Sequence, residues 1–88
     1  METQRPIIGN LYRVYRDIYD NGGKYGLILY DKGYDKNFIL PIRDIVMYLG
    51  IKNKRLESEV EHSVLYMGRV YYFWHMIKLS KIVFEEAC

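Results

Sequence analysis

The sequence predicts a small α+β domain of three helices and one or two short β-hairpins. Three segments repeat apolar residues along one helical face, at residues 10–20, 42–49 and 54–64. Two other segments, at residues 27–40 and 65–75, are rich in residues with high strand preference and contain turn residues near their middle. We therefore expect the helices to form most of the core and the hairpins to lie beside them.

The first predicted helix covers residues 10–20 and has a signal at each end. Asn10 can cap its N-terminus through its side-chain oxygen, and Asn21-Gly22-Gly23 supplies the left-handed residue that ends many helices. Its apolar face is formed by Leu11, Val14, Tyr15 and Ile18.

The segment YGLILYDKGYDKNFILP follows this helix and has a different pattern. Its short apolar runs at residues 27–30 and 37–40 lie on either side of the turn-rich DKGYDK. This pattern predicts a hairpin, or a strand followed by a loop.

Pro41 stands at the favoured first position of a second predicted helix, which ends at Gly50. A four-residue turn, Gly50-Ile51-Lys52-Asn53, leads into a third helix that begins near Lys54, with Asn53 as its cap. The apolar faces of the three helices are expected to pack together. The predicted core consists of Leu11, Val14, Ile18, Ile42, Ile45, Leu49, Leu56 and Val60.

A second hairpin is expected to turn near Gly68, because strand-forming residues lie on both sides of it in LYMGRVYYFWHM. Residues 76–87 fit a possible C-terminal helix or a further strand equally well. Their spacing does not decide between the two.

The order of these elements resembles that of the winged helix-turn-helix DNA-binding proteins. The resemblance rests on YRDIYDNGG as the end of a helix, PIRDIVMYLGIKNKRLESEVEHSVL as the helix-turn-helix and LYMGRVYYF as the wing. It implies that the third helix lies in the major groove of double-stranded DNA, while the wing touches the phosphate backbone.

A basic cluster coincides with the start of this third helix. When residues 54–64 are wound at 100° per residue, the centre of the outward face carries Lys54, Arg55, Ser58 and His62, while the turn and the wing add further donors. The residues expected to bind nucleic acid are Lys52, Asn53, Lys54, Arg55, Ser58, His62 and Arg69. The alternative is a solvated surface on which Arg55 and Glu59 form an ordinary ion pair.

Composition limits the classes of protein and the compartment. Half of the 88 residues are hydrophobic and 27% are charged, which predicts one globular domain over residues 1–88. The net charge of +2 is only mildly basic, so a nucleic-acid footprint depends on where Lys and Arg are placed. The one cysteine, Cys88, excludes an intrachain disulfide. With neither a signal peptide nor a membrane-spanning run in this sequence, a cytoplasmic protein without membrane contact is expected.

The sequence does not favour catalysis or metal binding. His62, His75 and Cys88 are 13 residues apart in each step, unlike the short paired spacings of zinc sites. Gly22-Gly23 is not followed by the Lys-Ser/Thr of a phosphate-binding loop. We therefore expect no enzyme, no catalytic residue, no cofactor and no metal.

The function predicted from these observations is transcription regulation by a small DNA-binding homodimer. Dimerisation is expected because this aromatic-rich chain should have an apolar face left over, for which residues 76–84 are the candidate interface. The alternative is a non-enzymatic viral or phage interaction protein that binds and inhibits a host protein.

Overall fold

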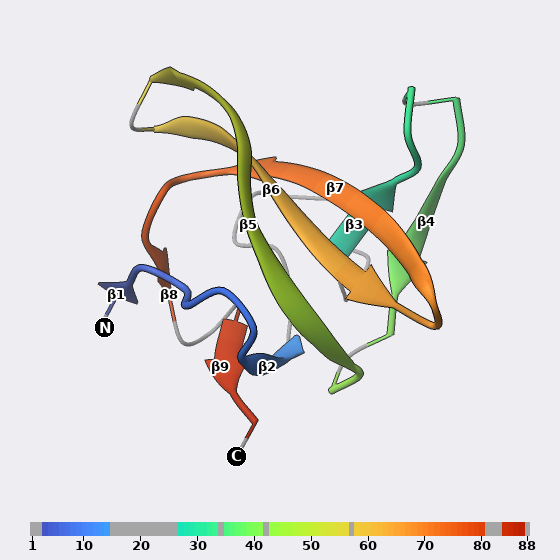
Figure 1. Ribbon diagram of the computed structural model, residues 1–88, viewed down its shortest axis with the longest axis horizontal. Coiled ribbons are helices and arrows are strands. Elements are labelled where there is room, and N and C mark those ends of the chain that lie inside the picture. Colours follow the sequence, from blue (N-terminus) through green and yellow to red (C-terminus); the bar gives the residue numbers. More distant parts are fainter. Residues whose placement is uncertain are drawn as a thin grey trace.

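The computed structural model describes residues 3–14, 27–33, 35–41, 43–56, 58–80 and 84–87, and every regular element in these ranges is a β-strand (Figure 1). The predicted α+β winged helix-turn-helix fold with three helices is therefore wrong. These ranges accordingly contain no helix long and apolar enough to span a membrane. The strands are β1 (Thr3–Gln4), β2 (Leu11–Val14), β3 (Leu27–Tyr30), β4 (Asn37–Leu40), β5 (Ile45–Leu56), β6 (Glu59–Tyr66), β7 (Arg69–His75), β8 (Leu79–Ser80) and β9 (Phe84–Glu86).

Seven of these strands form one antiparallel sheet in the order β4-β3-β7-β6-β5-β2-β9. Its centre is the meander β5-β6-β7, whose strands also follow one another along the chain. Figure 1 shows these long strands bending strongly, so that the sheet curls into a half-barrel. Strands β1 and β8 form a separate two-stranded antiparallel ribbon beside it.

Strand β5 replaces the second predicted helix and the start of the third. Burial alternates along its first half, where Val46 and Tyr48 are buried but Ile45 is exposed and Met47 half-buried. This period of two belongs to a strand with one face toward a core. The eight residues 42–49 are too few to distinguish this alternation from helical spacing. Pairing of β5 with β2 and β6 stabilises the strand instead of a helix.

The third predicted helix is instead the tip of a hairpin. Residues 54–56 end β5, Ser58 lies in the turn, and residues 59–66 form β6, which is paired on both sides. Within β6 the side chains of Val60, His62 and Val64 are fully buried. Non-local pairing has overridden the helix preference of the Glu-rich sequence here.

The first predicted helix is wrong over its described part. Residues 11–14 form β2, which pairs with β5 and β9, while residues 15–20 lie outside the described residues. Tyr12 and Val14 are buried at alternate positions of this strand. The helical pattern matched because Leu11 and Val14 are three residues apart, a spacing that short strands also contain.

Both predicted hairpins are confirmed. Strands β3 and β4 pair from Leu27↔Leu40 to Tyr30↔Asn37 around the DKGYDK segment. Strands β6 and β7 are joined by Met67 and Gly68, with φ of 51° and 78°. Positive φ at both loop residues is typical of a type I′ turn, whose twist matches that of the strands.

Residues 76–87, which fitted a helix and a strand equally well, form strands β8 and β9 in their described parts. Leu79 on β8 and Phe84 on β9 are each 1% exposed, because both pack into the core of the same chain. These two side chains of the candidate dimer interface are therefore unavailable to a partner.

The core lies on the concave side of the curled sheet and is rich in aromatic rings. Its buried members are Tyr12, Val14, Leu27, Leu29, Leu40, Val46, Tyr48, Val64, Phe73, Leu79 and Phe84. Tyr12 stacks on Phe84 with ring centroids 4.6 Å apart. Such pairs add about 0.5–1.5 kcal/mol beyond their area burial.

The predicted core is correct only in part. Val14 and Val60 are buried and Leu49 is half-buried. Ile18 and Ile42 lie outside the described residues. Leu11, Ile45 and Leu56 are exposed, at 41%, 45% and 63%, because in a strand they occupy the face opposite their buried neighbours.

Candidate nucleic-acid interface

Five of the seven residues predicted to bind nucleic acid lie together at the tip of the β5–β6 hairpin. Lys52, Asn53, Lys54 and Arg55 occupy the last part of β5, Ser58 lies in the turn, and all five are exposed. The cluster thus exists, but on a strand instead of a helix. The register of β5 against β6 shifts between Ile51 and Asn53 and again between Lys54 and Leu56, and the cluster is divided between the two faces of the sheet.

Register shows which residues share a face. Asn53 pairs with Glu61, Glu61 pairs with Trp74, and Ser63 pairs with Tyr72. Directly opposed residues of neighbouring strands project from the same side of a sheet. We call this side the outer face, and the opposite side, which carries Val60, His62 and Val64, the inner face.

Two cation–aromatic pairs lie on the outer face. The Nζ atom of Lys52 is 4.4 Å from the ring centroid of Tyr72 and 3.2 Å from its hydroxyl oxygen. The guanidinium carbon of Arg55 is 4.7 Å from the ring centroid of Trp74. Tyr72 and Trp74 are two residues apart on β7, so the pairs are neighbours, about 7 Å apart.

Carboxylates engage part of this cluster. Arg55 Nη1 lies 3.2 Å from Glu59 Oε1, which confirms the predicted ion pair, although it spans a hairpin turn instead of one helical turn. Their side chains are 67% and 45% exposed, so the pair contributes at most about 1 kcal/mol. Asn53 Nδ2 donates to Glu61 Oε1 at 2.6 Å, and Glu61 is buried.

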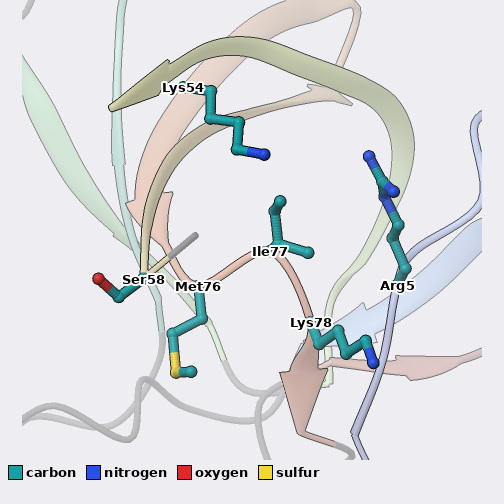
Figure 2. A pocket seen from close by; sticks show the side chains of 6 residues that line it. All are labelled: Arg5, Lys54, Ser58, Met76, Ile77 and Lys78. Atoms are coloured by element: carbon teal, nitrogen blue, oxygen red, sulfur yellow. The ribbon is translucent and has the colours of Figure 1, made fainter. Parts of the chain in front are cut away.

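Lys54 belongs to the inner face, because it is in register with Val60 and, across β6, with His75. There it lines a pocket of about 450 Å³ together with Arg5, Ser58, Met76, Ile77 and Lys78. Figure 2 shows Lys54 and Arg5 projecting into the same opening above Ile77, with Lys78 on the Arg5 side. Three cations from three distant parts of the sequence thus meet at one pocket.

Known proteins add no further guide to this site. Comparison of the chain with protein-family models, curated proteins and solved structures found no match in any of the three. Within the described ranges, no group of three or more His, Cys, Asp or Glu side chains is placed to hold a metal ion.

The structure places His62 in the interior, not on the nucleic-acid-binding surface where the helical pattern put it. Its Nε2 lies 2.7 Å from the Met76 carbonyl oxygen, which can only accept, so Nε2 carries the proton. Nδ1 then accepts from the Tyr48 hydroxyl at 2.7 Å. Burial lowers the pKa of His62 to about 4 and raises the pKa of Tyr48 to about 12.

These contacts hold the segment that lines the pocket. Besides accepting from His62, Met76 donates its backbone N–H to Nδ1 of His75 at 3.0 Å. Both histidines are buried on the inner face. The strand alternation of residues 60–64 was the sequence signal that points His62 inward.

Arg69 lies at the other end of β6, in the β6–β7 turn region (Figure 1). It lines a smaller pocket of about 240 Å³ with Asp31, Lys36, Asn37, Phe38 and Tyr71. Arg69 is therefore remote from the hairpin-tip cluster and is not brought together with it.

Three residues of this region had not been predicted as contributors, namely Arg5, Trp74 and Lys78. Trp74 lies in the strand-forming run after Gly68, and the structure shows it half-buried under Arg55. Arg5 and Lys78 meet because β1 pairs with β8. No local sequence signal marks the pairing of segments so far apart.

Proposed function

We propose that the chain binds single-stranded nucleic acid through the tip of its β5–β6 hairpin. The observation that carries this proposal is the pair of neighbouring cation–aromatic contacts on the outer face, Lys52 with Tyr72 and Arg55 with Trp74. Cations contact the phosphate backbone, while aromatic rings and guanidinium planes stack on bases without selecting their sequence.

The distribution of charge supports the same proposal. The chain as a whole carries only +2, yet three cations, Lys52, Lys54 and Arg55, lie in the last part of β5, and two more, Arg5 and Lys78, share a pocket with Lys54. The described carboxylates among them are Glu59, which pairs with Arg55, and Glu61, which is buried; Glu57 lies outside the described residues. A local positive potential of this kind attracts polyanions more strongly than the net charge indicates.

A single strand suits this surface better than a duplex. Base faces inside a duplex are covered by their neighbours, so the half-buried Trp74 ring and the exposed Arg55 guanidinium gain stacking contacts only with unpaired bases. The Tyr72 ring is itself buried and serves to position Lys52. Residues 54–64, which the sequence pattern predicted as a helix in the major groove, form the end of β5, a turn and most of β6. The proposed binding mode therefore replaces groove recognition by a helix.

Intrinsic fluorescence offers a direct test, because Trp74 is the only tryptophan of the chain. Titration with an oligonucleotide of mixed sequence should quench its emission, and the single strand should bind more tightly than its duplex. Replacing Lys52 and Arg55 by Gln should weaken binding and make the salt slope shallower by up to ~1.4, since each phosphate contact contributes about 0.7 for single strands.

Lys32→Gln provides the matched control, because Lys32 is exposed in the β3–β4 turn, away from the hairpin tip (Figure 1). It should leave affinity and salt slope nearly unchanged. Binding that is absent at low ionic strength, or an equal loss in the control and the Lys52/Arg55 variant, would refute the proposal.

Protein binding is a second candidate, favoured by an apolar row across the outer face. Leu11, Met47, Leu65 and Val70 follow one another in register over β2, β5, β6 and β7. Leu11 and Val70 are 41% and 42% exposed, and exposed apolar patches often mark protein contacts. Sedimentation velocity of the chain and of its Val70→Lys variant tests whether two copies of the chain pair through this surface. A dimer that Val70→Lys converts to a monomer would support this pairing, and a monomer for both proteins would exclude it.

A further inference from the structure

The pocket on the inner face is distinct from the two cation–aromatic pairs on the outer face. Three cations line it: Lys54 on β5, Arg5 directly after β1, and Lys78 directly before β8. Its apolar wall is provided by Met76 and Ile77. At about 450 Å³ it falls in the range of about 300–1,000 Å³ that is usual for ligand pockets.

Two of its cations oppose each other across the β1–β8 ribbon. The register Thr3↔Ser80 and Gln4↔Leu79, continued by one residue, brings Arg5 opposite Lys78. Like charges placed directly opposite destabilise a strand pair. In the described part of the chain, no carboxylate forms an ion pair with Arg5, Lys54 or Lys78. An anion bound between them would remove this repulsion.

We infer that this pocket binds the terminal phosphate of a nucleic-acid strand, an inference that rests on the proposed function. A terminal phosphate monoester carries about −1.5 to −2 at pH 7, whereas each backbone phosphate carries a single charge. Three cations that line one pocket match the more highly charged group. Met76 and Ile77 then offer apolar surface to the sugar or base of the terminal nucleotide.

The pocket is held in shape before any ligand arrives. Met76 is anchored by hydrogen bonds to His62 and His75, both of which are buried. Leu79, one residue beyond Lys78, is also buried. A site whose backbone is already ordered spends less of its binding energy on ordering.

Fluorescence anisotropy with three internally labelled strands of one sequence tests this inference. One strand carries a 5′-phosphate, one a 3′-phosphate and one hydroxyl groups at both ends. We expect one phosphorylated strand to bind about tenfold more tightly than the hydroxyl strand, as for a charge-assisted contact. Whichever strand gains identifies the end that enters the pocket.

Variants connect this advantage to the pocket. The double variant Arg5→Gln/Lys78→Gln should abolish the affinity advantage of the phosphorylated strand. It should change the affinity for the hydroxyl strand much less than the affinity for the phosphorylated strand. The charge-retaining pair Arg5→Lys with Lys78→Arg should keep most of the advantage, and Lys32→Gln should keep all of it.

Each remaining outcome has a defined meaning. Equal affinity for the three strands, or an advantage that survives in the Arg5→Gln/Lys78→Gln variant, would overturn the inference and leave the proposed function standing. Failure of all three strands to bind would overturn both.

Discussion

His62 connects the core to the proposed binding region. One ring nitrogen accepts from the Tyr48 hydroxyl, and the other donates to the carbonyl oxygen of Met76, which lines the pocket. The ring also stacks on Phe73, with centroids 5.0 Å apart. A fully buried polar side chain with both nitrogens in hydrogen bonds fixes one arrangement of its neighbours.

Acidification should destabilise the protein through His62. Its pKa is lowered from 6.5 to about 4 in the folded chain, so between these values the unfolded chain binds a proton that the folded chain does not. Stability is therefore fully present above pH 6.5 and decreases as the pH falls toward 4. The total loss is about 3 kcal/mol, at 1.36 kcal/mol per pKa unit.

Urea denaturation of the protein and of His62→Gln at several pH values measures this effect. The variant should be less stable near neutral pH but should lack the part of the pH dependence that His62 causes. The same loss of stability between pH 6.5 and 4 in both proteins would show that His62 is not responsible.

The residues of the hairpin tip were predictable as a group because they are adjacent in the sequence. Lys52, Asn53, Lys54 and Arg55 needed only local inspection. Their division between two faces depended on knowing that the segment is a strand, and the contribution of Arg5 depended on the β1–β8 pairing. Local pattern thus identified the basic cluster but not its geometry.

At the scale of elements, the long β5–β6 hairpin gives the sheet its curl. Its register shifts three times, between Tyr48 and Gly50, between Ile51 and Asn53, and between Lys54 and Leu56. Irregularities of this kind bend a strand and increase its twist. The basic end of the hairpin lies at the upper left of Figure 1, and its Lys54 shares a pocket with Arg5 and with Met76, Ile77 and Lys78 of the segment after β7.

Hairpins were predictable from the sequence where a turn signal was local. Gly68 lies in a two-residue turn, and the pairing of β3 with β4 closes over the DKGYDK segment. The predicted helices failed because apolar spacings of three or four residues also occur in strands with bulges. What decided between the two was pairing between β2, β5 and β6, which a single sequence does not reveal.

Gly50→Ala tests the first irregularity. Gly50 has φ of 115°, and a Cβ atom there would lie 3.1 Å from Cδ1 of Ile8. Backbone strain and this close contact together should reduce stability by about 1–3 kcal/mol. Gly9→Ala is the matched control, because Gly9 also has positive φ (+90°) but has no atom within 4 Å of the added Cβ.

Thermal denaturation of both variants separates strain from contact. Gly50→Ala should lose more stability than Gly9→Ala, which carries the backbone strain alone. Equal losses would mean that the Ile8 contact contributes nothing at this position.

At the scale of the whole molecule, segments from the two ends of the sequence close the core. Phe84 on β9 stacks on Tyr12 of β2 and lies 6.1 Å from Phe73 of β7 and 6.4 Å from Tyr48 of β5, measured between ring centroids. One C-terminal ring thus contacts aromatic rings from three other strands. The fold therefore depends on contacts between distant parts of the chain, which form more slowly than local ones.

Truncation at Phe84 and at Leu56 distinguishes this core from the helical core that the sequence pattern indicated. Phe84 is 1% exposed, so Phe84→Ala should reduce the free energy of unfolding by about 3–5 kcal/mol, a large share of the roughly 5–15 kcal/mol of a typical domain. Leu56 is 63% exposed near the hairpin tip, so Leu56→Ala should change it by less than about 0.5 kcal/mol. A helical bundle with Leu56 in its core requires a loss of about 2–5 kcal/mol at that position instead. Urea denaturation measures both, and a large loss at Leu56 with little at Phe84 would contradict the all-β core.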